Sequence, residues 1–207
     1  TFQNCTSLRS IPAKLFSKNT NITTNAFAGT FNGCSNLREI PPDLFRYNTL
    51  VSTTAFNLTF QGCISLKSIP ADLFRYNTAV TTTAFASAFN NSGITEIPAD
   101  LFRYNTAVST TAFSGTFFGT PIESVPADLF KYNTAVADSN FNATFGECTG
   151  ITSIPPTLFS TNVNVFGTSF TATFRGCTGI TSIPATLFAA NTKVTAGFNA
   201  TFSGTSI

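Results

Sequence analysis

The feature that most constrains this chain is the segment Ile69–Thr78, which recurs with a period of 28 or 29 residues. The seven copies are marked by their prolines: Pro12, Pro41, Pro70, Pro98, Pro126, Pro155 and Pro184. A repeat of this length is typical of solenoids, in which each copy forms one coil of a stack. The sequence therefore predicts one solenoid over residues 1–207, and we expect it to begin and end inside a repeat.

Composition narrows the classes of function. Apolar residues make up 43% of the chain, enough for a core, whereas charged residues make up only 10%. The net charge of +2 gives no electrostatic case for nucleic acid, and no apolar run approaches the ~18 residues of a membrane span. The absence of His removes His-based catalysis and the commonest metal ligand. We therefore expect no enzyme, no catalytic or metal site and no cofactor.

Phenylalanine defines the predicted core. The chain has 24 phenylalanines, and all but Phe118 and Phe166 fall into three columns at the repeat period. The first column is Phe16, Phe45, Phe74, Phe102, Phe130, Phe159 and Phe188. The second is Phe27, Phe56, Phe85, Phe113, Phe141, Phe170 and Phe198, and the third is Phe2, Phe31, Phe60, Phe89, Phe117, Phe145, Phe174 and Phe202. Rings that recur in every coil are expected to stack in the interior.

The segment Phe141–Phe145 alternates large, polar, small, polar and large residues. Alternation with period two predicts a short strand that pairs in parallel with the same segment of the adjacent coils. In this prediction Ala143 points inward between the rings, and Asn142 and Thr144 point outward. After the strand, Pro70 and Asp72 suit the first turn of a helix, so one or two helical or 3₁₀ turns are expected over residues 70–76.

Two polar columns accompany the rings. Asn77 and its six equivalents either end the helical turn in a left-handed conformation or form a stacked amide ladder, and the sequence does not decide between these. The five cysteines share one position, three residues after the last Phe of the predicted strand: Cys5, Cys34, Cys63, Cys148 and Cys177. Since five is odd and the residues form one column rather than facing pairs, we expect buried free thiols.

The combination Thr-Phe-x-Gly-Cys-x-x-Leu-x-Ser-Ile-Pro, as in Thr59–Pro70, resembles the cysteine variant of the leucine-rich repeat, with Phe in place of Leu. Within that class it is most similar to the BspA-like group of bacterial, protist and phage surface proteins. The resemblance covers the whole chain. It implies a right-handed coil with a parallel β-sheet on one face and short helical or 3₁₀ turns on the other.

Two surfaces are free of core requirements. The first is a stripe confined to the second to fifth copies: Arg46, Tyr47, Arg75, Tyr76, Arg103, Tyr104, Lys131 and Tyr132. Arg and Tyr are frequent anchors at interfaces, although pairing with the neighbouring acids is the alternative role. The second is the outward face of the predicted sheet: Asn57, Thr59, Thr116, Asn142, Thr144, Thr173, Asn199 and Thr201. Sugar hydroxyls or polar protein surface would suit it, and β-propensity with solubility is the alternative reason for its composition.

These features predict a non-enzymatic binding or structural module of an extracellular, cell-surface or virion-surface protein, adhesin-like or phage tail-fibre-like. Its expected partners are protein or glycan surfaces, without nucleic acid and without membrane insertion of this segment. One alternative is a self-assembling filament component, in which coils stack end to end or form another homo-oligomer. A second alternative is an ice-binding solenoid that uses the Thr column.

Overall fold

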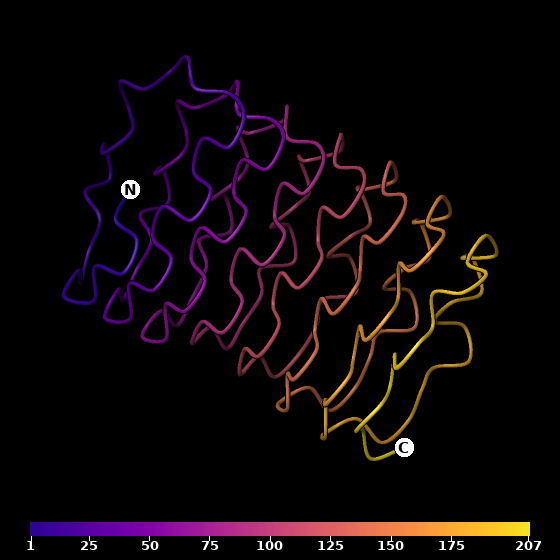
Figure 1. The fold of residues 1–207 in the computed structure, drawn as a ribbon. Helices are drawn as coiled ribbons and strands as arrows, with labels where there is room; N and C mark the ends of the chain where they lie inside the picture. The colour runs from indigo at the N-terminus through magenta and orange to yellow at the C-terminus, as the bar shows by residue number, and fades with distance from the viewer.

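In the computed structural model, which describes residues 1–207, the chain winds into successive coils that lie side by side, with the two termini at opposite ends of the stack (Figure 1). We number the coils 1 to 7 by their prolines, from Pro12 to Pro184. None of the 95 backbone hydrogen bonds belongs to a helix or a strand, so there are no such elements to delimit. The backbone is instead a succession of turns joined by short links of irregular structure.

Backbone hydrogen bonds alternate between two directions in the segment that was expected to be a strand. In coil 2, the N–H groups of Phe27, Gly29 and Phe31 donate to carbonyls of coil 3 that lie 28 residues further along the chain. The intervening N–H groups of Ala28 and Thr30 donate within their own coil, to the carbonyls three residues back. A parallel sheet would send both sets of groups to neighbouring strands. Half of the donors therefore hold the stack together, and half close turns.

The expected β-strand is wrong, because every fourth residue of this segment has a left-handed backbone. In coil 2 these are Asn25, Gly29 and Gly33, with φ of 55°, 61° and 73°. The middle position of the Phe-x-small-x-Phe segment is left-handed in every copy: Gly29, Leu58, Ser87, Gly115, Ala143, Ala172 and Ala200, with φ between 50° and 61°. Such a residue turns the chain and breaks the period-two alternation of a strand.

The outward Thr column is a second correction. Within the segment, residues at positions one, four, five and eight face the interior, as Phe27, Thr30, Phe31 and Cys34 do in coil 2. The predicted surface threonines are accordingly buried: Thr59, Thr116, Thr144, Thr173 and Thr201. The small residue expected inside, Ala143, is instead partly exposed. The left-handed turn at that residue swaps the two positions.

The three phenylalanine columns form the core, as the sequence predicted. Rings of one column stack almost parallel from coil to coil, for example Phe85 on Phe113 with centroids 5.9 Å apart. Phe85 and Phe113 belong to the second column, and Phe102, from the first column, tilts against both of them at 4.8 and 4.7 Å. Offset and tilted arrangements at such distances are the favourable geometries of aromatic pairs. The core is thus one continuous aromatic stack along the length of the protein.

Each phenylalanine column is followed, three residues later, by a column of polar side chains: Thr after the second column, Cys after the third and Asn after the first. The N–H of this polar residue bonds the Phe carbonyl of its own coil, as Thr144 does with Phe141. Its side chain donates to the Phe carbonyl of the preceding coil: Thr144 Oγ1 lies 2.9 Å from the Phe113 oxygen. Cys148 Sγ lies 3.0 Å from the equivalent oxygen of Phe117. Most buried Phe carbonyls therefore accept two bonds, and the carbonyls of Phe56, Phe60, Phe89 and Phe174 are the exceptions that receive no side-chain donor.

The sequence left two roles open for the Asn column: a left-handed residue that ends the helical turn, or a stacked ladder of amides. The structure matches neither role fully. No residue of this column has a positive φ. In Asn105 the amide nitrogen donates to the carbonyls of Phe74 and Asn77 in the preceding coil, at 3.1 and 3.0 Å. The contacts are thus made to backbone rather than to the next amide. The Oδ1 atoms of six buried members have no hydrogen-bond partner: Asn48, Asn77, Asn105, Asn133, Asn162 and Asn191.

The segment from Pro to Asn consists of overlapping turns rather than a helix. In coil 3 the N–H groups of Leu73, Arg75 and Asn77 each bond the carbonyl three residues back, while the alternate N–H groups of Phe74 and Tyr76 do not. Leu73 and Phe74 face the core, and Arg75 and Tyr76 face outward. This spacing places one basic and one aromatic side chain per coil on a common outer edge.

A gap in the Thr column provides a test of the Phe carbonyl bonds. Coil 4 carries buried Ala88 where the other coils carry Thr, so the carbonyl of Phe56 receives no side-chain donor. We expect Ala88→Thr to raise the free energy of unfolding by about 1 kcal/mol, because it adds a hydrogen bond to a buried acceptor. Thr144→Val should lower it by about 1–3 kcal/mol, because it removes one. Urea unfolding measures both, and a destabilised Ala88→Thr protein would contradict the bonding scheme.

The left-handed positions provide a second test. Thr83 has a φ of 57°, a conformation that is costly for a β-branched residue, whereas Asn25 holds the same position in coil 2. We expect Thr83→Asn to raise the free energy of unfolding by about 0.5–1 kcal/mol. The same change at exposed Thr106, which does not have a positive φ, is the control and should stay within about ±0.5 kcal/mol. Equal effects at both sites would exclude the left-handed conformation at Thr83.

Candidate binding surfaces

The predicted stripe forms a continuous ridge on the outer edge of coils 2 to 5, which we call the Arg–Tyr ridge. Its eight residues are those predicted: Arg46, Tyr47, Arg75, Tyr76, Arg103, Tyr104, Lys131 and Tyr132. All are exposed, and the Tyr side chains retain between 36% and 49% of their accessible surface. A row of four partly exposed aromatic rings is the main apolar feature of this edge.

Each guanidinium of the ridge lies between two tyrosine rings. The Cζ atom of Arg75 is 5.8 Å from the ring centre of Tyr76 in its own coil and 5.2 Å from that of Tyr104 in the next. Arg46 and Arg103 repeat this arrangement, with 5.1 and 5.0 Å to the ring in the next coil. Cation–π contacts at these distances contribute roughly 0.5–1 kcal/mol each at exposed sites. The ridge is therefore an alternating row of cations and rings.

Acidic residues balance the charge of the ridge. Each Arg or Lys is paired with the Asp three residues earlier, with nitrogen–oxygen distances of 3.5 Å in coils 2 to 4 and 3.3 Å in coil 5. Because these pairs are exposed, they contribute little to stability. The ridge has equal numbers of acidic and basic groups and so offers aromatic surface and paired hydrogen-bonding groups without a net charge.

The ridge ends where coil 6 begins. Ser160 and Thr161 replace Arg and Tyr there, and Ala189 and Ala190 replace them in coil 7. Thr161 Oγ1 donates to the carbonyl of Lys131 at 2.9 Å and covers the end of the row. The core of coils 6 and 7 is continuous with that of coils 2 to 5. The fold therefore does not require the ridge residues.

The second predicted surface, the Thr and Asn face of the expected sheet, does not form in the structure. Its threonines are buried, as described above, and only Asn57, Asn142 and Asn199 remain at least partly exposed. Asn57 uses its amide nitrogen to bond the carbonyl of Ala86 at 2.8 Å. The hydroxyl array on which ice binding or sugar binding at this face depended is therefore absent from the surface.

The cysteine column is confirmed as unpaired thiols. All five cysteines are free; Cys5 is exposed and the other four are buried. Burial raises the pKa of Cys63 and of Cys177 to about 12, and that of Cys148 to about 11. Protonated thiols are poor nucleophiles and poor metal ligands. These four buried residues serve the hydrogen bonds to Phe carbonyls rather than chemistry.

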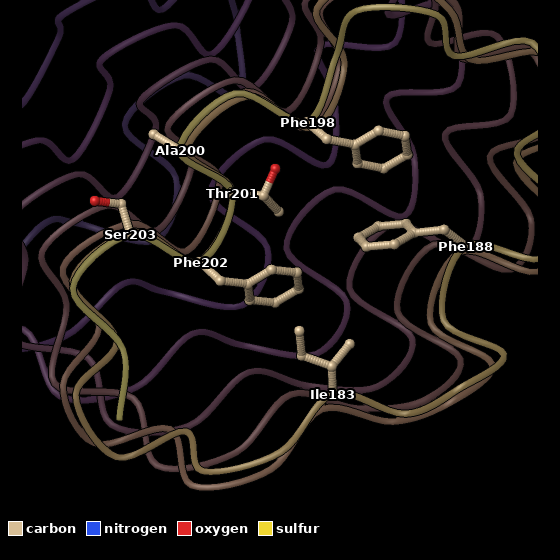
Figure 2. A pocket seen from close by; sticks show the side chains of 7 residues that line it. All are labelled: Ile183, Phe188, Phe198, Ala200, Thr201, Phe202 and Ser203. Carbon is tan, nitrogen blue, oxygen red and sulfur yellow. The ribbon is translucent and has the colours of Figure 1, made fainter. Parts of the chain in front are cut away.

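Open hollows occur at the two ends of the stack. At the last coil, Phe188, Phe198 and Phe202 converge with Ile183 around a hollow of about 550 Å³ (Figure 2). The hollow at the first coil, about 160 Å³, is lined by Phe2, Phe31 and neighbouring aliphatic residues. Both are exposed cross-sections of the aromatic core. Neither lining contains an acid, a base or a cysteine that could perform catalysis.

Comparison with known proteins assigns this chain to no family. Neither the family models nor the curated proteins gave a match to this sequence. No cluster of three or more His, Cys, Asp or Glu side chains with the geometry of a metal site is present. No helix is long and apolar enough to cross a membrane.

The buried thiols predict a pH dependence of stability. In the unfolded chain a thiol ionises near pH ~8.5, whereas in the folded protein Cys63, Cys148 and Cys177 stay protonated to higher pH. The free energy of unfolding should therefore be unaffected below pH ~8.5 and should fall above it, by about 1.4 kcal/mol per pH unit for each thiol.

Urea unfolding at pH ~8 and pH ~10.5 measures this fall in stability. The control replaces these three cysteines by Thr, the residue that coil 5 carries as Thr120 at the same position. The variant should lose markedly less stability at the higher pH. A loss equal to that of the unaltered protein would mean that the thiols are not buried in the protonated form.

Proposed function

We propose that this chain is a non-enzymatic binding module whose Arg–Tyr ridge contacts the surface of a protein or glycan partner. The observation that supports this is the restriction of the ridge to coils 2 to 5, although the same core continues through coils 6 and 7. Residues that the fold does not need, and that expose aromatic rings beside fixed cations, are typical of interface anchors. The ridge is pre-organised, because each Arg is held by one Asp and two rings, as in Arg75.

The wider setting of the module is also a proposal. A rigid coil stack with few charges fits a part of an extracellular, cell-surface or virion-surface protein, such as an adhesin or a phage tail fibre. The 28- or 29-residue period and the coil-on-coil packing support kinship with leucine-rich-repeat solenoids of the BspA-like group. The left-handed turns in place of strands distinguish this chain from the parallel-sheet form of that class.

Of the two alternatives, end-to-end assembly has the exposed Phe rings at both ends in its favour. Its electrostatics are unfavourable, because residues 1–38 and residues 148–207 both contain basic but no acidic residues. Joining the two ends would bring like charges together. The ice-binding alternative loses its support, because the Thr column that it requires is buried.

Binding of the purified protein to an array of defined surface glycans tests the role of the ridge. We expect the double variant Tyr76→Ala/Tyr104→Ala to lose at least about tenfold in affinity, because it removes two central rings that also hold the cations. The variant Ser160→Arg/Thr161→Tyr extends the ridge by one coil and should bind at least as tightly as the unaltered protein.

The matched control is Ser160→Ala/Thr161→Ala, which alters the corresponding positions where no ridge exists. It should bind as the unaltered protein does. Equal binding by the control and by Tyr76→Ala/Tyr104→Ala would show that the ridge is not the site. Failure of the unaltered protein to bind any glycan would contradict glycan recognition and leave protein partners as the class to be screened.

A further inference from the structure

A second charged surface lies just before the proline of each coil. It is formed by the residues between two buried apolar positions: the Leu or Ile that follows the Cys position, and the Ile or Val that precedes the proline. We call it the charged strip. It consists of the two residues at this place in each coil, and its charged members, all exposed, are Arg9, Arg38, Glu39, Lys67, Glu96 and Glu123. The equivalent positions in coils 6 and 7 hold only Thr and Ser.

Backbone hydrogen bonds place the members of the strip in adjacent rows. The N–H of Arg38 donates to the carbonyl of Arg9 at 3.2 Å. Further along, Thr95 donates to Lys67 at 3.3 Å and Glu123 donates to Thr95 at 3.2 Å. Arg9, Arg38 and Lys67 thus form a column of like charges on coils 1 to 3. Such a column is unfavourable by itself.

No charge of the strip is compensated within the chain. The five ion pairs of the structure are the four of the Arg–Tyr ridge and one between Arg175 and Glu147. All six charged members of the strip are exposed and none takes part in these pairs. The strip therefore has free charges of both signs, with the basic ones on coils 1 to 3 and an excess of acidic ones on coils 4 and 5.

The order of these charges makes the strip complementary to itself in the antiparallel direction. If a second copy is placed with a two-fold axis between coils 3 and 4, Arg38 meets Glu123 of the second copy. The symmetry forms this pair twice. The remaining charges meet neutral residues, since Arg9 faces Thr152, Lys67 faces Thr95, Glu39 faces Ser124 and Glu96 faces Ser68. No like charges oppose one another across this arrangement.

An exposed apolar side chain lies close to the same axis. Ile64 in coil 3, three residues before Lys67, has 61% of its surface exposed. The equivalent residue in coil 4 is Gly93, where any Cβ would collide with the Ile64 carbonyl. In the antiparallel arrangement, Ile64 of one copy lies opposite Gly93 of the other. The centre of the surface is thus apolar and small, and its flanks are charged.

We propose that the charged strip is a self-recognition surface, through which two copies of this chain associate side by side in antiparallel orientation. The partner is a second copy because Arg38 and Glu123 face each other, twice, when the strip is set against its own reverse. Exposed ion pairs are individually weak and are screened by salt. The association is therefore a concentration-dependent dimer that weakens as ionic strength rises, and it leaves the Arg–Tyr ridge free for another partner.

Analytical ultracentrifugation of the purified chain at low ionic strength tests this surface by charge exchange. Arg38→Glu and Glu123→Arg, each alone, should weaken self-association by about tenfold or more, because each change turns two attractive pairs into repulsive ones. A mixture of the two variants should form a heterodimer as tightly as the unaltered protein dimerises, since both contacts between positions 38 and 123 are then attractive, one with its native charges and one with its charges exchanged.

The control is Lys18→Glu, which makes a charge change of the same kind at an exposed residue outside the strip. It should leave self-association unchanged, and thermal unfolding of all variants checks that the exposed substitutions preserve the fold. A chain that remains monomeric at high concentration and low salt would overturn the proposal. Single variants that associate as tightly as the unaltered protein, or a mixture that does not recover, would also overturn it.

Discussion

The structure depends on phenylalanine carbonyls that accept two hydrogen bonds. One bond comes from the N–H three residues later in the same coil, and the other comes from a Thr, Cys or Asn side chain of the following coil. The first bond makes the turn that brings the ring inward, and the second joins the turn to its neighbour. In the Phe-x-small-x-Phe segment, alternate backbone N–H groups donate in the opposite direction, toward the following coil. Each interface between coils is therefore bonded in both directions.

The sequence was sufficient to predict the parts that follow from residue type and period alone. The Phe columns were predictable as core because they are large, apolar and strictly periodic, as are the Leu residues that precede the first of them. The alternation in Phe141–Phe145 predicts a strand with Thr144 on its outer face, whereas the left-handed turn at Ala143 places Thr144 in the core. The signal against a strand was the four-residue spacing of Asn25, Gly29 and Gly33, all residue types that favour a left-handed backbone.

The candidate binding surfaces were predicted less completely, because their geometry depends on the offset between coils. The sequence identified Arg75 and Tyr76 as neighbours and Asp72 as the pairing acid of Arg75, and these contacts exist. It did not predict the contact of Arg75 with Tyr104, 29 residues later, which makes the ridge continuous. The charged strip was missed because its members are spread over five coils. Stacking, rather than local sequence, places its charges in one row.

The bonding of the Phe113 carbonyl is the most direct test of this account. Nuclear magnetic resonance of the labelled protein can detect couplings across hydrogen bonds and slowly exchanging hydroxyl protons. We expect the Phe113 carbonyl to couple with the N–H of Thr116 in its own coil, and we expect the Thr144 hydroxyl proton to exchange slowly because it is buried on the same oxygen. Coupling of that carbonyl to a backbone N–H of an adjacent coil, with rapid exchange at Thr144, would contradict it.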